Sequence, residues 1–258
     1  SVPYDDGFTA TVNGVPADEV EKAFGTYVTL LERGCGIDFG RKAMAGFFDK
    51  VEKFEAADTS TNVFEFFEEM VPKYFYDPNS PVRNEDLYLP YVSRLAVSDY
   101  VDPDMKPAYD HDAQMCSLNM IGSPAADFTF TDLGGKRHTL YGVKAETTLL
   151  FFTNPGCPAC KEIIESLTSD GKIADLVASG RLAVVNVYID EELDKWRENA
   201  SVYPKNWYNG YDQSYIIRSD VTYNVRAIPS LYVLDSEKKV IMKDAPVENV
   251  LPYLDNLK

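Results

Sequence analysis

Two cysteines placed three positions apart are the residues of this chain with the clearest chemical potential. Cys157 and Cys160 stand in the stretch FFTNPGCPACKEIIESL, between an apolar run and an amphipathic run. If a helix begins there, its unpaired backbone N–H groups and its dipole would lower the pKa of the first thiol from about 8.5. Lys161 adds positive charge nearby. We expect Cys157 to attack a disulfide and Cys160 to resolve the mixed disulfide.

Metal binding and simple burial are the alternatives for this pair. A zinc site would need two further ligands, and the chain supplies no second Cys-x-x-Cys and no closely spaced histidine pair. We therefore expect no metal. The other cysteines, Cys35 and Cys116, each stand alone, where a small buried apolar residue is the usual role. A purely structural role for Cys157 and Cys160, with both buried and unreactive, does not fit the position of Cys157 at a helix start after a buried strand. The remaining possible ligands are His111 and His138.

A proline further along the chain supports the redox interpretation. In YNVRAIPSLYVLD, Ile228 and Pro229 come just before a predicted strand. In Cys-x-x-Cys folds, a proline with a cis peptide bond lies opposite the disulfide and leaves the preceding backbone free to pair with a substrate segment. A proline at the start of a strand is otherwise an ordinary edge residue. The expectation of a cis bond therefore depends on the combination with CPAC.

The second half of the chain alternates between strand and helix patterns. Two short runs around Gly134-Gly135 predict a β-hairpin, and two continuous apolar runs predict strands buried on both faces. The last two strands are joined by few residues, so they must be antiparallel. A closing helix is expected to be interrupted or kinked by Pro252. This pattern predicts an α/β fold with parallel pairing in its centre. The buried and final strands are expected over 147–153, 181–189, 230–235 and 238–244, and helices over 160–167, 191–200 and 247–257.

The first half of the chain has helical patterns. Apolar residues recur at helical spacing from Met44 to Phe54 and from Val63 to Tyr74, and a further helix is expected from Asn84 to Val97. Two start signals accompany them. Asn62 with Glu65 predicts a capping box, and Ser80 with Pro81 predicts an N-cap and a first helical residue. The sequence therefore predicts an all-α domain here.

Charge and length limit the possible functions. The 258 residues carry a formal net charge of −16, which argues against nucleic-acid binding because phosphate contacts need a basic face. The first 120 residues account for −12 of this (10 basic, 22 acidic) and the rest for −4 (15 basic, 19 acidic). This asymmetry supports two domains, which we place at 1–118 and 119–258. No apolar run approaches the roughly 18 residues of a membrane span.

The segment between the predicted strand that ends at Ile189 and Pro229 is long, and it contains the stretch YPKNWYNGYD. Its aromatic residues are Trp207, Tyr208 and Tyr211. Exposed on a loop, they could contact a substrate. We favour the alternative, in which they pack the segment onto the body of the domain.

With CPAC and Ile228-Pro229 in place, the chain resembles the thioredoxin superfamily. The segment from Gly122 to Phe128, Gly-x-x-Ala-x-Asp-Phe, resembles the opening hairpin of its extracytoplasmic reductases. The match covers about residues 121–258. The first half resembles a helical domain of unknown function that precedes such modules in envelope proteins of gut anaerobes. The resemblance implies a thioredoxin-like C-terminal domain: a central mixed sheet flanked by helices, with an N-terminal β-hairpin.

The resemblance also implies roles for individual residues. Cys157 would be the nucleophile and Cys160 the resolving thiol of a redox-active centre that needs no metal or organic cofactor. Ile228 and the cis-proline Pro229 would contact the substrate. So would the two residues between the cysteines, Pro158 and Ala159.

Several positions depart from the family pattern. Gly156 replaces the tryptophan before the first cysteine, and Phe151 falls where cytoplasmic thioredoxins carry a buried aspartate. Ile163, flanked by Glu162 and Glu165, falls where cytochrome-maturation reductases carry a glutamate. The resemblance therefore assigns no proton acceptor for Cys160.

The function implied is a thiol–disulfide oxidoreductase that reduces protein disulfides, with a thiol electron-donor protein as its other partner. One alternative is a thioredoxin-fold binding module without turnover in an envelope complex. Another is a peroxide-linked redoxin, although Leu150 and Asn154 replace that motif's proline and threonine. We expect export to the periplasm or outer envelope. The resemblance leaves room for a lipoprotein tether through a removed N-terminal segment.

Overall fold

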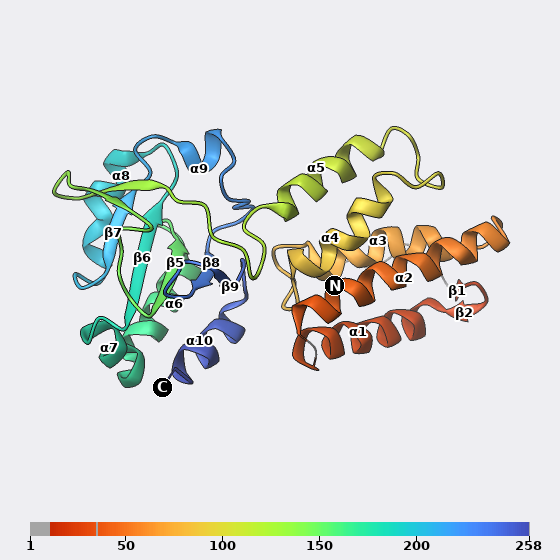
Figure 1. Cartoon of the computed structure of the whole chain (residues 1–258), viewed down its shortest axis with the longest axis horizontal. Coiled ribbons are helices and arrows are strands. Elements are labelled where there is room, and N and C mark those ends of the chain that lie inside the picture. Colours follow the sequence, from red (N-terminus) through yellow and green to blue (C-terminus); the bar gives the residue numbers. More distant parts are fainter. Residues whose placement is uncertain (1–10, 35, 258) are drawn as a thin grey trace. The chain divides into compact units, whose positions relative to one another are not determined.

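Residues 11–34 and 36–257 are described by the computed structural model. The chain divides into a unit of residues Ser1–Ser117, called here the helical unit, and a unit of residues Leu118–Lys258, called the sheet unit (Figure 1). Within the described ranges, no helix is long and apolar enough to cross a membrane.

The helical unit is built from five helices and a short β-ribbon. Phe24, Met44, Phe48, Val71 and Tyr91 come from four of the helices and are buried in one core. The apolar spacing predicted from Met44 and from Val63 is confirmed as helical. In chain order the elements are β1 (Thr11–Val12), β2 (Val15–Pro16), α1 (Ala17–Gly34), α2 (Ile37–Ala57), α3 (Val63–Phe75), α4 (Glu85–Leu95) and α5 (Lys106–Ser117).

Asn62 is the N-cap residue of α3, as predicted, but the capping box is absent, and the all-α description needs the β-ribbon added to it. The side chain of Asn62 does not cap α3. Its Oδ1 instead accepts from Asn13 N at 3.0 Å and its Nδ2 donates to Thr11 O at 2.9 Å. An amide has both a donor and an acceptor, so the Asn62 side chain can bind the β1–β2 ribbon at two points. A helix N-cap would use only its oxygen.

The start predicted for α4 at Ser80 and Pro81 was also wrong. Ser80 belongs to the turn after α3, because its Oγ donates to Tyr74 O at 2.6 Å. Asn84 is the actual N-cap, and its side chain accepts from Leu87 N at 3.1 Å. The helix itself, predicted from Asn84, is confirmed.

The sheet unit is a mixed seven-stranded sheet with the order β4-β3-β7-β6-β5-β8-β9. β5 pairs parallel with β6 and antiparallel with β8, while β3 and β4 form the predicted hairpin. The antiparallel pairing of the last two strands is confirmed. In chain order the elements are β3 (Thr129–Asp132), β4 (Arg137–Thr139), β5 (Thr147–Phe152), α6 (Pro158–Ser169), α7 (Gly171–Ala178), β6 (Leu182–Tyr188), α8 (Leu193–Asn199), η1 (Ala200–Val202), β7 (Tyr208–Tyr211), α9 (Ile216–Ser219), β8 (Ser230–Leu234), β9 (Val240–Met242) and α10 (Val247–Asp255).

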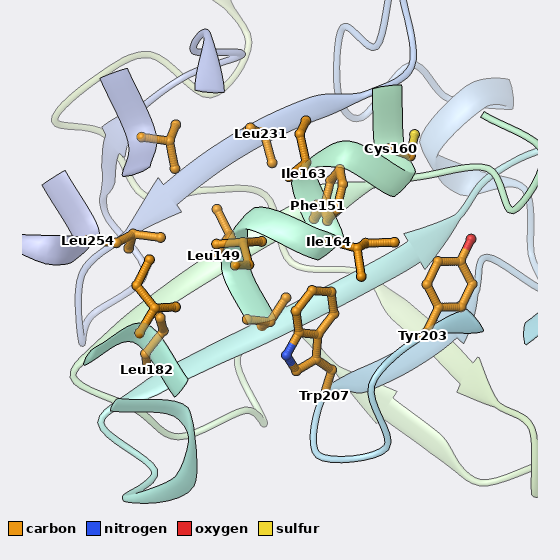
Figure 2. Packing of buried hydrophobic residues seen from close by; sticks show 14 of the residues in the cluster. Leu149, Phe151, Cys160, Ile163, Ile164, Leu182, Tyr203, Trp207, Leu231 and Leu254 are labelled. Carbon is orange, nitrogen blue, oxygen red and sulfur yellow. The ribbon is translucent and has the colours of Figure 1, made fainter. Parts of the chain in front are cut away.

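Both faces of the sheet are covered, which explains the continuous apolar pattern of its central strands. On one face, Leu149 and Phe151 of β5 belong to a core with residues of α6, α7 and α10 (Figure 2). On the other face, Leu150 and Phe152 belong to a core with the β3–β4 hairpin and α9. Every residue of β5 is buried, so this strand forms a rigid base for the turn that follows it.

A strand that the sequence did not predict, β7, lies between β6 and β3. Gly210 makes this position possible, since a Cβ there would lie 2.6 Å from the Phe130 ring and 2.8 Å from Thr131 O. Trp207 and Tyr211 are buried, whereas Tyr208 is 37% exposed. The favoured expectation that this segment packs onto the body therefore holds for two of its three aromatic residues.

The closing helix α10 continues through Pro252 without interruption, so the predicted break was wrong. Proline removes the hydrogen bond that its N–H would make to the carbonyl four residues earlier. That residue, Glu248, is exposed, and water can satisfy its carbonyl.

Candidate functional site

The cysteine pair lies at the junction where β5 gives way to α6. Asn154 shapes this turn, because its Oδ1 accepts from Gly156 N at 3.0 Å and its backbone oxygen accepts from Cys157 N at 3.0 Å. Its amide nitrogen also donates to Asp190 Oδ2 at 3.1 Å. The short polar loop therefore has its own hydrogen bonds and delivers Cys157 directly to the first turn of the helix.

Cys157 is the N-cap of α6, with Pro158 at the first helical position. Its sulfur accepts a hydrogen bond from Cys160 N at 3.1 Å, which uses one of the unpaired N–H groups of a helix start. A negative charge on this sulfur would be stabilised by the same N–H group and by the helix dipole. The arrangement matches the geometry expected for an attacking thiol.

The two thiols differ in exposure. Cys157 is partly exposed, whereas Cys160 is 1% exposed. Burial, together with the contact with Cys157, raises the pKa of the Cys160 thiol to about 12. Cys160 is therefore a protonated thiol at neutral pH, and it is shielded from reagents in solution. Pro158 and Ala159, between the two, are exposed.

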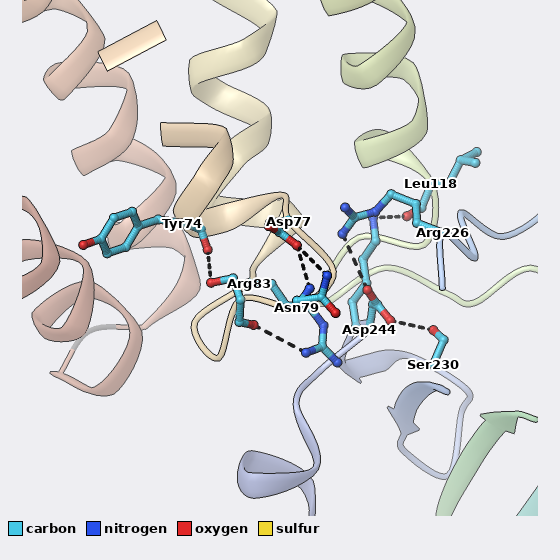
Figure 3. Close-up of polar contacts among 10 residues, drawn as sticks. Tyr74, Asp77, Asn79, Arg83, Leu118, Arg226, Ser230 and Asp244 are labelled. Atoms are coloured by element: carbon cyan, nitrogen blue, oxygen red, sulfur yellow. Dashed lines mark hydrogen bonds and ion pairs between the residues drawn. The ribbon is translucent and has the colours of Figure 1, made fainter. Parts of the chain in front are cut away.

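The loop that carries Pro229 reaches the same sulfur. The Ile228-Pro229 peptide bond is cis, as expected, and Ile228 O lies 4.0 Å from Cys157 Sγ. The residue after the proline is anchored, because Ser230 Oγ donates to Asp244 Oδ1 at 2.7 Å (Figure 3). Arg226 Nη2 lies 3.6 Å from the other oxygen of this buried carboxylate. Asp244 thus links both sides of the loop and holds Ile228 beside the thiol.

A cavity of about 160 Å³ is lined in part by both cysteines. Its walls come from the turn after β5, from α6 and from the segment that follows α8. The residues that line it are Asn154, Pro155, Cys157, Cys160, Lys161, Ile164, Glu165, Val202 and Tyr203.

One wall residue, Tyr203, is held by a buried chain of polar side chains. Its Oη lies 3.1 Å from Thr153 Oγ1, which also makes a short hydrogen bond to Asn186 Oδ1. Asn186 Nδ2 donates to Asn209 Oδ1 at 3.0 Å, and Asn209 Nδ2 donates to Pro204 O at 2.7 Å. Thr153 and Asn186 are fully buried.

The direction of these hydrogen bonds follows from the Pro204 end of the chain. A backbone carbonyl only accepts, so the NH₂ of Asn209 must face it and the oxygen of Asn209 must face Asn186. Asn186 then offers its oxygen to Thr153, which has a single hydroxyl proton to give. Thr153 has used its proton on Asn186, so in its contact with Tyr203 the Thr153 oxygen accepts and the Tyr203 hydroxyl donates. Burial raises the pKa of Tyr203, so the phenol stays neutral and can only accept from the cavity.

We expect Asn186→Leu to lower the free energy of unfolding by about 2 kcal/mol, because the Thr153 hydroxyl proton loses its acceptor and the Asn209 oxygen loses its donor. Asn206→Leu, at an exposed turn position, is the matched control and should change stability by less than about 0.5 kcal/mol. Urea denaturation measures both. Equal midpoints for the two variants would contradict the assigned chain.

The structure brings Cys157, Cys160 and Ile228 together, with Pro229 next in the chain. Lys161 lines the same cavity as Cys157, and its side chain is 77% exposed with Nζ 3.7 Å from Glu165 Oε1. The attraction of a carboxylate one turn away accounts for this.

The positions where family members carry acidic groups are apolar here. Phe151 and Ile163 are buried in the core, so neither position supplies a base. Of the two flanking glutamates, Glu165 lines the cavity. Sequence reasoning missed Thr153, Asn186 and Tyr203. The available signal was a polar residue in each of two apolar strands: Thr153 at the end of the predicted strand 147–153, and Asn186 inside the strand 181–189.

Cys116 and His138 each have surroundings of their own within their units. Cys116 is fully buried in the core of the helical unit, while Cys35 lies outside the described residues. His138 stacks on Phe130, with Nε2 2.8 Å from Asp132 Oδ2. Among the residues that the structure describes, no group of three or more His, Cys, Asp or Glu side chains could hold a metal ion.

A mixed sheet with a Cys-x-x-Cys at a helix start and a cis-proline beside it defines the thioredoxin-fold class. Comparison with solved structures agrees. A thioredoxin-like protein from Bacteroides caccae ATCC 43185 is 35% identical, with a TM-score of 0.82 over 92% of this chain and 83% of that one. The chain belongs to this family of thioredoxin-like proteins.

Other comparisons match one unit at a time. The C-terminal domain of an uncharacterized protein from Bacteroides fragilis NCTC 9343 is 45% identical over 53% of this chain and 97% of that one, with a TM-score of 0.51. A conserved protein of unknown function from Bacteroides fragilis is 33% identical over 52% and 98%, also with a TM-score of 0.51. Residues 10–119 match DUF5106, a domain of unknown function. No curated protein matches the chain.

Proposed function

We propose that this protein is a thiol–disulfide oxidoreductase that reduces protein disulfides through Cys157 and Cys160. The observation that supports it best is the asymmetry of the pair. The partly exposed sulfur of Cys157 caps α6 and accepts the Cys160 N–H at 3.1 Å, while Cys160 is buried directly behind it. Cys157 can therefore contact the disulfide of a large substrate, whereas Cys160 can react only with a disulfide formed at Cys157.

The reaction proceeds in two exchanges. The Cys157 thiolate attacks one sulfur of the substrate disulfide, forming a mixed disulfide, and the other substrate sulfur leaves as a thiolate. Cys160 then loses its proton and attacks Cys157 Sγ. This forms the Cys157–Cys160 disulfide and releases the second substrate sulfur, which takes up a proton. Two electrons and two protons pass to the substrate, and a thiol donor protein must return them.

Ile228 has a separate role in this proposal. Its backbone lies beside Cys157, where an extended substrate segment could pair with it. Pro229 has no N–H, so it presents no competing donor at this point. The exposed Pro158 and Ala159 form the opposite side of the contact. We further propose an exported, envelope-associated protein, on the strength of the Gly122–Phe128 hairpin motif.

The alternative is a binding module without turnover, and the buried Phe151 in place of a carboxylate favours it. Insulin reduction with dithiothreitol as donor separates the two. An oxidoreductase accelerates precipitation of the insulin B chain above the uncatalysed rate, whereas a binding module leaves that rate unchanged. A peroxide-linked redoxin is disfavoured, because Leu150 is fully buried in β5.

The role of each cysteine can be tested by limited alkylation. At pH 7 we expect iodoacetamide to label Cys157 at least about tenfold more than Cys160, because Cys160 is 1% exposed and its pKa is raised to about 12. Reduced protein with Cys35→Ser would be digested and the labelled peptides quantified by mass spectrometry. Denatured protein is the control and should label both sites. Faster labelling of Cys160 in the folded protein would reverse the assignment.

A further inference from the structure

The geometry points to a specificity pocket: the 160 Å³ cavity beside the cysteine pair takes a neutral, apolar side chain adjacent to the attacked disulfide of a protein substrate. This inference rests on the proposed oxidoreductase function and adds the substrate class to it.

The position of the cavity determines which part of a substrate can enter it. Cys157 and Cys160 themselves form part of its wall. A substrate sulfur bonded to Cys157 therefore lies at the cavity, and a side chain that enters must belong to a residue close to that sulfur. Ile228 approaches Cys157 through its backbone oxygen and is not among the lining residues, so the pocket is a contact separate from the cis-proline loop.

The walls of the pocket are largely apolar. Ile164 and the ring of Tyr203 are buried within the protein (Figure 2). Val202 is 53% exposed. Pro155 adds a further apolar surface. An apolar cavity of roughly 150 Å³ can hold a benzene molecule, so one leucine- or phenylalanine-sized side chain is a suitable occupant here. Contact with such a side chain would also cover Val202.

The polar groups at the pocket select against an acidic side chain. Lys161 and Glu165 face each other across 3.7 Å, which leaves little net positive charge to attract a carboxylate. The Tyr203 hydroxyl donates its proton to Thr153, so toward the pocket it can only accept a hydrogen bond. An ionised carboxylate has no proton to donate to it. The donors among the lining residues already have acidic partners, because Lys161 faces Glu165 and Asn154 Nδ2 donates to Asp190 Oδ2 at 3.1 Å. Desolvating a further carboxylate beside them is costly, whereas an apolar side chain loses nothing there.

The pocket is also preformed. Tyr203 is fixed through Thr153 and Asn186 to Asn209, whose amide is fixed by the Pro204 carbonyl. A wall that is already held in place does not have to be ordered when the substrate binds, which favours affinity and selectivity.

Three cystine-linked peptides test this inference, identical except for leucine, serine or glutamate next to the cystine. Burial of a leucine side chain predicts a kcat/KM about tenfold higher for the leucine peptide than for the serine peptide. The glutamate peptide should be the poorest substrate. Equal values for the three peptides would overturn the pocket.

A pair of variants links the preference to this cavity. Val202→Asp should lower the leucine-to-serine ratio of kcat/KM from about ten to near one. Leu133→Asp, at a 57% exposed position in the β3–β4 turn, is the matched control and should keep the wild-type ratio. Because a ratio is compared within each variant, partial loss of folded protein does not affect it. An unchanged ratio in Val202→Asp would overturn the assignment.

A single-turnover measurement separates this inference from the proposed function. Cys160→Ser protein forms a mixed disulfide with a peptide without completing a catalytic cycle. If wild-type protein turns over no disulfide, yet trapping is faster with the leucine peptide than with the glutamate peptide, the oxidoreductase function fails and the pocket stands. If turnover occurs and trapping rates are equal, the pocket fails and the function stands.

Discussion

Cys157→Ser is expected to abolish disulfide reduction, lowering turnover with insulin by roughly a thousandfold or more, as loss of a nucleophile commonly does. A serine hydroxyl is not ionised at neutral pH, and the buried Cys160 cannot reach a protein disulfide in its place. The measurement is insulin turnover with dithiothreitol as donor.

Cys160→Ser should have a different phenotype, which identifies the second step. Cys157 would still attack the substrate, but the mixed disulfide would persist because no thiol stands behind it. Non-reducing electrophoresis and intact mass should show a covalent protein–substrate adduct. The control is the double variant Cys35→Ser, Cys116→Ser, which should keep its turnover. Residual turnover in Cys157→Ser, or loss of turnover in the control, would point to a relay through other cysteines.

The position of the reactive pair could be predicted from sequence because it depends on local features. The apolar run before Cys157 and the amphipathic run after it predicted a strand and a helix, and both are present. The cis bond before Pro229 was predicted from a resemblance, since nothing in the local sequence distinguishes it from an ordinary edge proline.

The supporting groups of the site could not be predicted in the same way. Asn186 lies within an apolar strand, and its partners are 33 residues away in Thr153 and 23 residues away in Asn209. Only the pairing of β6 with β5 and β7 brings these side chains together. β7 itself depends on Gly210 fitting against Phe130, which is a tertiary contact without a local pattern.

The helical unit shows two kinds of missed element. In α1, Phe24, Val28 and Leu31 are buried at helical spacing, so its pattern was present in the sequence and would have predicted it. In α5, the apolar face is narrow: Cys116 is buried, and Tyr109 and Ala113 pack against the same core at helical spacing from it. A short, mostly polar helix of this kind gives a weaker signal in the sequence than α1.

The second large effect expected is on the pH dependence of the resolving step. Decay of the mixed disulfide should accelerate about tenfold per pH unit between pH 6 and 9, because the reactive form of Cys160 is its thiolate. Burial is the largest cause of the raised pKa of this thiol and persists in the mixed disulfide, so the thiolate is a minor species over that range and its fraction rises in proportion to hydroxide. An unperturbed thiol, with a pKa of about 8.5, would already approach a plateau at pH 9.

Rapid mixing of reduced protein with a peptide disulfide, followed by acid quenching, measures this decay directly. A plateau below pH 8 would contradict the expectation and would mean that a nearby group takes the Cys160 proton in the mixed disulfide. The structure offers one carboxylate at the cavity, Glu165, and a neighbour on the same helix that does not line it, Glu162. Glu165→Gln would then remove the plateau and Glu162→Gln would retain it. If both variants retained it, neither carboxylate would be the acceptor, and Phe151 and Ile163 supply no base in their place.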